Sequence, residues 1–141
     1  MVLNDSLKLE RYKLVTERQK YFTELARDAF SSYVRFLTAL TAGAITLVST
    51  RNKLELRLPV VLFLVDGLLY LVWFLALVTS GQIVFCLVRW NGFRKAESKI
   101  NPDSPSPDSW WWIFETLYVI VVVLSAIVAW RIATQLPSLL G

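Results

Sequence analysis

The segment LPVVLFLVDGLLYLVWFLALVTSGQIVFCLV, residues 58–88, decides the fold, because Asp66 is the one charge in this long apolar run. As an α-helix it would be roughly 46 Å long at 1.5 Å per residue, whereas the hydrocarbon core of a bilayer is about 30 Å thick. Dividing the run at Thr79-Ser80-Gly81 would leave a second part too short to cross a membrane. The segment therefore predicts one long transmembrane helix, tilted or protruding.

Two further apolar segments lie on either side of it in the sequence. Residues 29–50 (AFSSYVRFLTALTAGAITLVST) contain only Arg35 as a charge, and residues 110–134 contain Glu115 near the start and Arg131 near the end. Both are long enough for a membrane helix. We therefore predict an all-α integral membrane protein whose domain at residues 35–141 has three spans, at about 35–50, 59–88 and 110–134.

The composition agrees with this class and excludes several others. Of 141 residues, 55% are hydrophobic and 18% charged, whereas soluble domains carry about a quarter charged residues. The absence of histidine and the single cysteine exclude His-based catalysis, a Cys/His zinc site and an internal disulfide. No phosphate loop and no nucleophile beside a base is present, so we expect neither an enzyme nor a cofactor or metal.

Residues 1–34 are predicted to form a charged, amphipathic cytoplasmic helix that continues into the first span. No glycine precedes Gly43 and no proline precedes Pro59, so nothing interrupts it. Its charges are of mixed sign rather than a basic block, which argues against a nucleic-acid partner. An apolar stripe with spacings of three and four contains Tyr12, Val15, Gln19, Phe22, Ala26, Ala29, Tyr33, Phe36, Leu40 and Gly43.

That stripe has two interpretations. It packs on the protein's own 89–109 segment, or it forms a stalk between copies or a docking face for a soluble partner, with contacts at Tyr12, Val15, Phe22 and Ala26. The 89–109 segment is the cytoplasmic linker. We expect the second helix to continue to about Lys99, because Pro102, Pro105 and Pro107 then prevent a helix. At its end Trp110, Trp111 and Trp112 are expected to form an interfacial aromatic belt.

The distribution of Lys and Arg predicts the orientation. The N-terminal segment and the linker, which share one side, carry more of them than the opposite flanks do. We therefore expect the protein in the cytoplasmic (inner) membrane, with its N-terminus in the cytoplasm and its C-terminus outside. The first set is Lys8, Arg11, Lys13, Arg18, Lys20, Arg27, Arg89, Arg94, Lys95 and Lys99, and the second is Arg51, Lys53, Arg57 and Arg131.

Charged residues within a membrane need a partner or an aqueous surface. Counting residues from the span ends places Arg35 level with Glu115, and Asp66 level with Arg131. One hypothesis is that these four residues form two ion pairs that fix how the helices pack. The other is that Asp66 or Glu115 faces the axis of an oligomer and forms a ring of carboxylates, as in cation pores.

Small residues indicate where membrane helices approach closely. Two sets occur, one in the first span and one in the third. Since a three-helix protomer can bury one set internally, the other is left for a neighbour, which favours a homo-oligomer. The sets are Ala39, Gly43 and Thr46, and Ser125, Ala129 and Ala133.

The segment ERYKLVTERQKYFTELARDAF (residues 10–30) and the span after it resemble, in architecture, the SLATT-type membrane effectors of bacterial antiviral and nucleotide-signalled systems. The resemblance implies a pore that assembles in the membrane and is triggered by a partner or ligand. Proteins of that type have two spans and a longer cytoplasmic end, whereas three spans are predicted here. No site residue is implied by the resemblance.

We therefore expect a homo-oligomeric pore or ion channel gated through its cytoplasmic helix, as a bacterial immune or stress effector. Conduction would follow the small and polar face of the first span, with Asp66 or Glu115 setting ion preference. The alternative is a non-conducting membrane anchor that docks a soluble cytoplasmic partner through residues 5–30. A holin-like lysis protein is a third reading, which the charged N-terminus and nearly uncharged tail disfavour.

Overall fold

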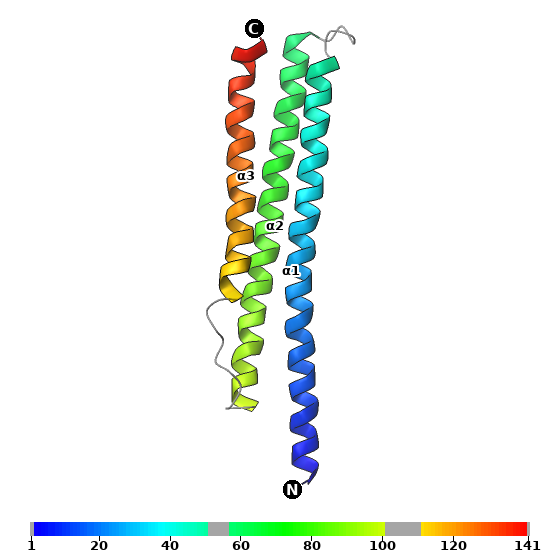
Figure 1. Cartoon of the computed structure of the whole chain (residues 1–141), viewed down its shortest axis with the longest axis vertical. Helices are drawn as coiled ribbons and strands as arrows, with labels where there is room; N and C mark the ends of the chain where they lie inside the picture. Colours follow the sequence, from blue (N-terminus) through cyan, green and yellow to red (C-terminus); the bar gives the residue numbers. More distant parts are fainter. Residues whose placement is uncertain (1, 51–56, 101–110, 141) are drawn as a thin grey trace.

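Three long helices make up the described part of the chain. The computed structural model describes residues 2–50, 57–100 and 111–140 (Figure 1). They form α1 (Val2–Thr50), α2 (Leu58–Ile100) and α3 (Trp111–Leu140). The helices run alternately up and down, so the two termini lie at opposite ends of the molecule (Figure 1). The prediction of an all-α protein with three helices is confirmed.

The first helix, α1, is unbroken over 49 residues, about 74 Å at the helical rise. It contains no proline, and Gly43 is its one glycine, the residue type with the lowest helix propensity after proline. The hydroxyls of Thr38, Thr41 and Thr46 each donate to the carbonyl four residues earlier, at 2.8 Å. These polar groups are thereby satisfied within the helix in an otherwise apolar segment.

The second helix, α2, begins at Leu58 and accepts Pro59 in its first turn, where no intrahelical donor is needed. The amides of Val60 and Val61 both donate to the carbonyl of Arg57. The helix continues past the apolar run to Ile100, close to the expected end at Lys99. It thereby runs beside the N-terminal half of α1 (Figure 1).

The core lies along α2, which stands between α1 and α3 (Figure 1). Its buried residues recur at spacings of three and four, the period of helix-on-helix packing. The small side chains of Ala76 and Ala126 allow close approach of α2 and α3. The buried positions in the apolar part of α2 are Val61, Val65, Leu69, Val72, Ala76, Thr79, Ile83 and Cys86.

The stripe of α1 packs as predicted over most of its length and departs at Phe36. Val15 and Tyr33 are buried and Leu40 packs on the core, whereas Phe36 is 56% exposed and Leu37 packs on the core in its place. A strict alternation of three and four averages 3.5 residues per turn, and a straight helix drifts from it by about 20° per heptad. One extra residue after Tyr33 restores the contact with α2.

Tyr33 links α1 to α3 by a buried hydrogen bond. Its hydroxyl lies 2.7 Å from Ser125 Oγ and donates to the carbonyl of Val122 at 3.3 Å. Tyr33→Phe is expected to lower the free energy of unfolding in detergent by about 1 kcal/mol, because the bond is lost while the ring still packs. Thr38→Val is the control, since that hydroxyl bonds only within α1. Equal losses in both variants would contradict this role.

Much of the outer surface is apolar. Phe63 and Leu77 on α2 are 76% and 74% exposed, and large hydrophobic side chains cover the outward sides of all three helices. A monomeric soluble protein does not expose apolar surface on this scale. In the described part of the chain, each of the three helices is long and apolar enough to cross a membrane.

Candidate functional site

The charged residues of the apolar segments lie apart from one another. Arg35, Asp66 and Arg131 are exposed, and Glu115 is half-buried. Among the residues that the structure describes, the ion pairs join Lys20 to Glu24 (3.9 Å) and Arg94 to Glu97 (3.1 Å). Neither predicted pair, Arg35–Glu115 or Asp66–Arg131, is formed within the chain.

The first pair fails because the two residues lie at different depths. Glu115 lines a small cavity with Phe22 and Ala26 of α1, whereas Tyr33 lies level with Ser125 of α3. The ten residues from Glu115 to Ser125 correspond to about 15 Å along the helix. Arg35 lies two residues beyond Tyr33, so it is about 18 Å, or about three turns, away from Glu115.

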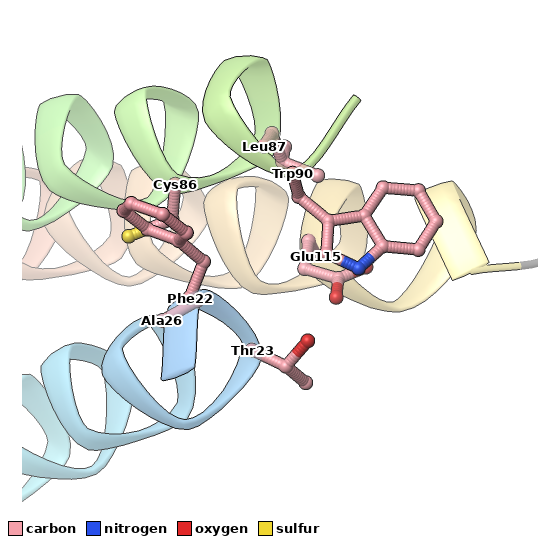
Figure 2. A pocket seen from close by; sticks show the side chains of 7 residues that line it. All are labelled: Phe22, Thr23, Ala26, Cys86, Leu87, Trp90 and Glu115. Atoms are coloured by element: carbon pink, nitrogen blue, oxygen red, sulfur yellow. The ribbon is translucent and has the colours of Figure 1, made fainter. Parts of the chain in front are cut away.

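Glu115 instead lies where the three helices meet. Figure 2 shows its carboxylate beside the indole of Trp90 from α2, with Thr23 of α1 nearby. The cavity measures about 10 Å³, enough for one water at most. Glu115 Oε2 is buried and has no hydrogen-bond partner among the described residues. The thiol of Cys86 is free and buried in the same wall.

Beyond this cavity a buried polar cluster fastens α1 to the end of α2. Glu97 accepts a hydrogen bond from Gln19 Nε2 at 2.8 Å and from Arg94 at 3.1 Å. Its side chain is 7% exposed, and the Arg94 guanidinium lies 5.2 Å from the ring centroid of Trp90. Sequence reasoning missed Glu97. Its position seven residues after Trp90, on the same helical face, was the available signal.

Aromatic contacts cover the predicted docking residues of α1. Phe22 stacks on Phe93 of α2 with centroids 5.8 Å apart and contacts Phe85 edge-on at 6.4 Å. Val15 and Ala26 are buried, and Tyr12 is half-buried. Between the two interpretations of the stripe, the structure supports packing on the protein's own chain, since Phe93 and Glu97 belong to residues 89–109.

The two sets of small residues have different surroundings. On α3, Ser125 contacts Tyr33, Ala129 packs on the core and Ala133 is half-buried. On α1, all three predicted small residues are exposed, and a side chain at Gly43 would meet open space. The set on α1, which consists of Ala39, Gly43 and Thr46, is therefore free for another contact.

Arg35 belongs to that free face of α1. At 100° per residue it lies about 200° from buried Tyr33, on the side turned away from α2. Ala39, Gly43 and Thr46 follow it at four, eight and eleven residues, which is one side of a helix. We call these four residues the α1 small face.

A second surface feature is an open apolar groove between α2 and α3, of about 300 Å³. We call it the aromatic groove. It is lined by Tyr70, Trp73, Ile127 and Trp130. Of the predicted aromatic belt, Trp110 falls outside the described residues, as do the side chains of Trp111 and Trp112.

Within residues 2–50, 57–100 and 111–140, no three His, Cys, Asp or Glu side chains gather so as to hold a metal ion. The comparisons with protein-family models, with curated proteins and with solved structures found no match to this chain.

Proposed function

We propose that the protein is a homo-oligomeric membrane pore or ion channel, gated through the cytoplasmic half of α1. The observation that carries the proposal is the α1 small face, where Arg35 lies exposed among Ala39, Gly43 and Thr46. An exposed guanidinium within a membrane helix is costly unless it faces water or an opposite charge. Small side chains let neighbouring copies bring such faces together around a water-filled path.

This arrangement assigns ion preference to Arg35 rather than to the carboxylates. Glu115 Oε2 is buried between helices, and Asp66 lies on the side of α2 that carries the aromatic groove. A ring of arginines at a constriction favours anions. The pore is accordingly proposed to prefer chloride to potassium.

The proposed gate is the contact between residues 12–28 of α1 and the end of α2. It combines the Phe22–Phe93 stack with the bond from Gln19 to Glu97. A cytoplasmic trigger that releases these contacts would free half of α1 while the other half stays in the bundle. The resemblance of residues 10–30 to SLATT-type effectors supports a role in bacterial immune or stress responses.

The proposed setting is the bacterial inner membrane with the N-terminus in the cytoplasm. All three helices are apolar enough to cross a bilayer, and the termini lie at opposite ends of the molecule. The end that holds the N-terminal half of α1 and the end of α2 carries more Lys and Arg, as cytoplasmic flanks do.

Ion flux from vesicles that contain the purified full-length chain tests the proposal. Flux above that of protein-free vesicles is expected, either constitutively or after a bacterial extract supplies the trigger. Absence of flux under both conditions would rule out the pore. The result would then favour the anchor described below.

Replacing Arg35 is expected to change selectivity without preventing assembly. One unit charge about 7 Å from an ion in water contributes about 0.6 kcal/mol, close to RT. The charge favours chloride and disfavours potassium by this amount each, so Arg35→Gln should lower the chloride-to-potassium permeability ratio by about sevenfold, and more where several subunits face the path. Arg27→Gln, on the same helix before the apolar segment, is the matched control and should leave the ratio unchanged. An unchanged ratio in Arg35→Gln would show that the α1 small face does not line the pore.

A non-conducting membrane anchor is the second candidate. Leu7, Leu14 and Tyr21 are 46%, 55% and 52% exposed and recur every seven residues on α1, outside the apolar segment. This stripe could dock a soluble helical partner. Leu14→Glu should then abolish co-purification of the partner, whereas a pore without such a partner would keep its flux in this variant.

A further inference from the structure

We propose that two copies of the chain associate through the aromatic groove, in a two-fold symmetric interface in which Asp66 of each copy pairs with Arg131 of the other. The inference rests on the membrane insertion and self-association of the proposed function, but not on conduction. The occupant of the groove is a second copy of this chain.

The groove is apolar along its floor and carries charge at one end. Its lining residues Tyr70, Trp73, Ile127 and Trp130 are between 37% and 69% exposed. Asp66 lies one turn before Tyr70 on the same side of α2, and Arg131 lies one turn after Ile127 on α3. Because α2 and α3 are antiparallel, both charges stand at the end of the groove near the start of α2 (Figure 1).

These charges are close in depth but do not meet within one chain. Asp66 and Arg131 are both exposed, and neither takes part in an ion pair in the described structure. Arg131 follows the buried Val122 by nine residues, which places it about 180° around α3 and away from α2. Its long side chain therefore extends outward from the rim of the groove.

A two-fold axis along the membrane normal brings the two charges together. Such an axis through the groove places α2 of one copy against α3 of the other, and the reverse. Asp66 then faces Arg131 of the second copy twice, at nearly equal depth. The arrangement is self-complementary, since the same patch supplies one acid and one base to each contact.

Within a membrane, a second copy of the chain is a more favourable occupant of the groove than lipid tails are. An unpaired carboxylate and an unpaired guanidinium in contact with hydrocarbon are both costly, and a reciprocal pair removes both costs at once. The aromatic side chains of two facing grooves also provide flat surfaces that stack on each other. A neutral acyl chain would cover the apolar surface of the groove but leave both charges unpaired.

Charge-reversal variants at positions 66 and 131 test the interface, with the association of differently tagged full-length chains as the measurement. Asp66→Arg alone would place two arginines together at each contact, and Arg131→Asp alone two aspartates. Each variant is expected to associate with itself at least about tenfold less than the natural chain does. Co-expression of the two variants restores both attractive pairs. A tagged Asp66→Arg chain should therefore co-purify the Arg131→Asp chain as efficiently as the tagged natural chain co-purifies the untagged natural chain.

The matched control replaces Arg131→Asp by Arg27→Asp, which puts the same substitution on α1 outside both the groove and the α1 small face. Asp66→Arg should recover less of that chain than of Arg131→Asp, because one of the two contacts still places two arginines together. A pair formed within one chain would predict no rescue by mixing and rescue only in the double variant Asp66→Arg/Arg131→Asp. Failure of the mixture, or no association of the natural chain, would overturn the proposal.

Disulfide crosslinking in vesicles gives a second measurement that keeps the natural charges. In a Cys86→Ala background, a Trp73→Cys chain should crosslink to an Ile127→Cys chain, because α2 of one copy faces α3 of the other. Trp73→Cys with Ile45→Cys, which is 61% exposed on α1, should crosslink at least about tenfold less. Equal yields would contradict the interface. Association with these properties but without ion flux would leave the interface standing and reject the pore.

Discussion

Replacing Glu97 by alanine is expected to detach the N-terminal half of α1 from α2. The carboxylate is 7% exposed and accepts bonds from both Gln19 and Arg94. Its removal leaves a largely buried guanidinium whose Nε already lacks a hydrogen-bond partner, and breaking such a pair costs about 3–5 kcal/mol. Hydrogen exchange of residues 6–28 measures the effect, with a rise of at least about a hundredfold expected, since each 1.4 kcal/mol is tenfold.

The matched control is Glu24→Ala, which removes an exposed ion pair with Lys20 on α1. Its partners are 77% and 58% exposed, so the change should be small. Exchange that rises equally in the two variants would contradict a special role for Glu97. In vesicles, Glu97→Ala should also conduct without a trigger if the contact between α1 and α2 is the gate.

Replacing Ala26 by leucine is expected to separate the same helices by overpacking. Ala26 is 1% exposed and lines the small cavity with Phe22 and Cys86. That cavity of about 10 Å³ cannot hold the added branched carbons, so α1 and α2 must move apart. Overpacking of this kind costs about 1–3 kcal/mol. The midpoint of denaturant unfolding in detergent measures the loss.

Ala42→Leu is the control on the same helix. Ala42 is exposed, and alanine and leucine have similar helix propensities, so the unfolding midpoint should not fall. A loss of stability in Ala42→Leu equal to that in Ala26→Leu would place the α1–α2 contact elsewhere than the structure has it.

The helices were predictable because their signals are local. Absence of proline and of early glycine predicted the unbroken α1, and the prolines after Lys99 predicted the end of α2 near Ile100. Periodicity also predicted most of the buried face of α1, from Val15 to Leu40. It failed at Phe36 because a small departure from 3.5 residues per turn accumulates over several heptads.

The positions of the charges were not predictable because they depend on how far the helices slide past each other. Counting from the span ends assumed that α1 and α3 enter the membrane at the same level. The structure instead places Glu115 beside Ala26, well before Arg35. Such an offset is set by packing between segments distant in sequence, which residue counting does not see.

The cluster at Glu97 was missed for a related reason. Glu97 lies in a segment rich in charge and followed by prolines, which the sequence predicted as the cytoplasmic linker. Its burial arises only because α1 extends far enough to cover it, with Gln19 at the matching height. A charged residue in phase with a buried helical face is the pattern that would have indicated it.

The unbroken length of α1 makes it a lever whose pivot is the contact of Tyr33 with Ser125. The arm from Val2 to the pivot is about 46 Å long and the arm from the pivot to Thr50 about 25 Å. A sideways push of about 5 Å at the N-terminal end would tilt the helix by about 6° and swing its far end about 3 Å the opposite way. A mechanical input at the N-terminal end of α1 would thus arrive at its other end reduced by about half and reversed in direction.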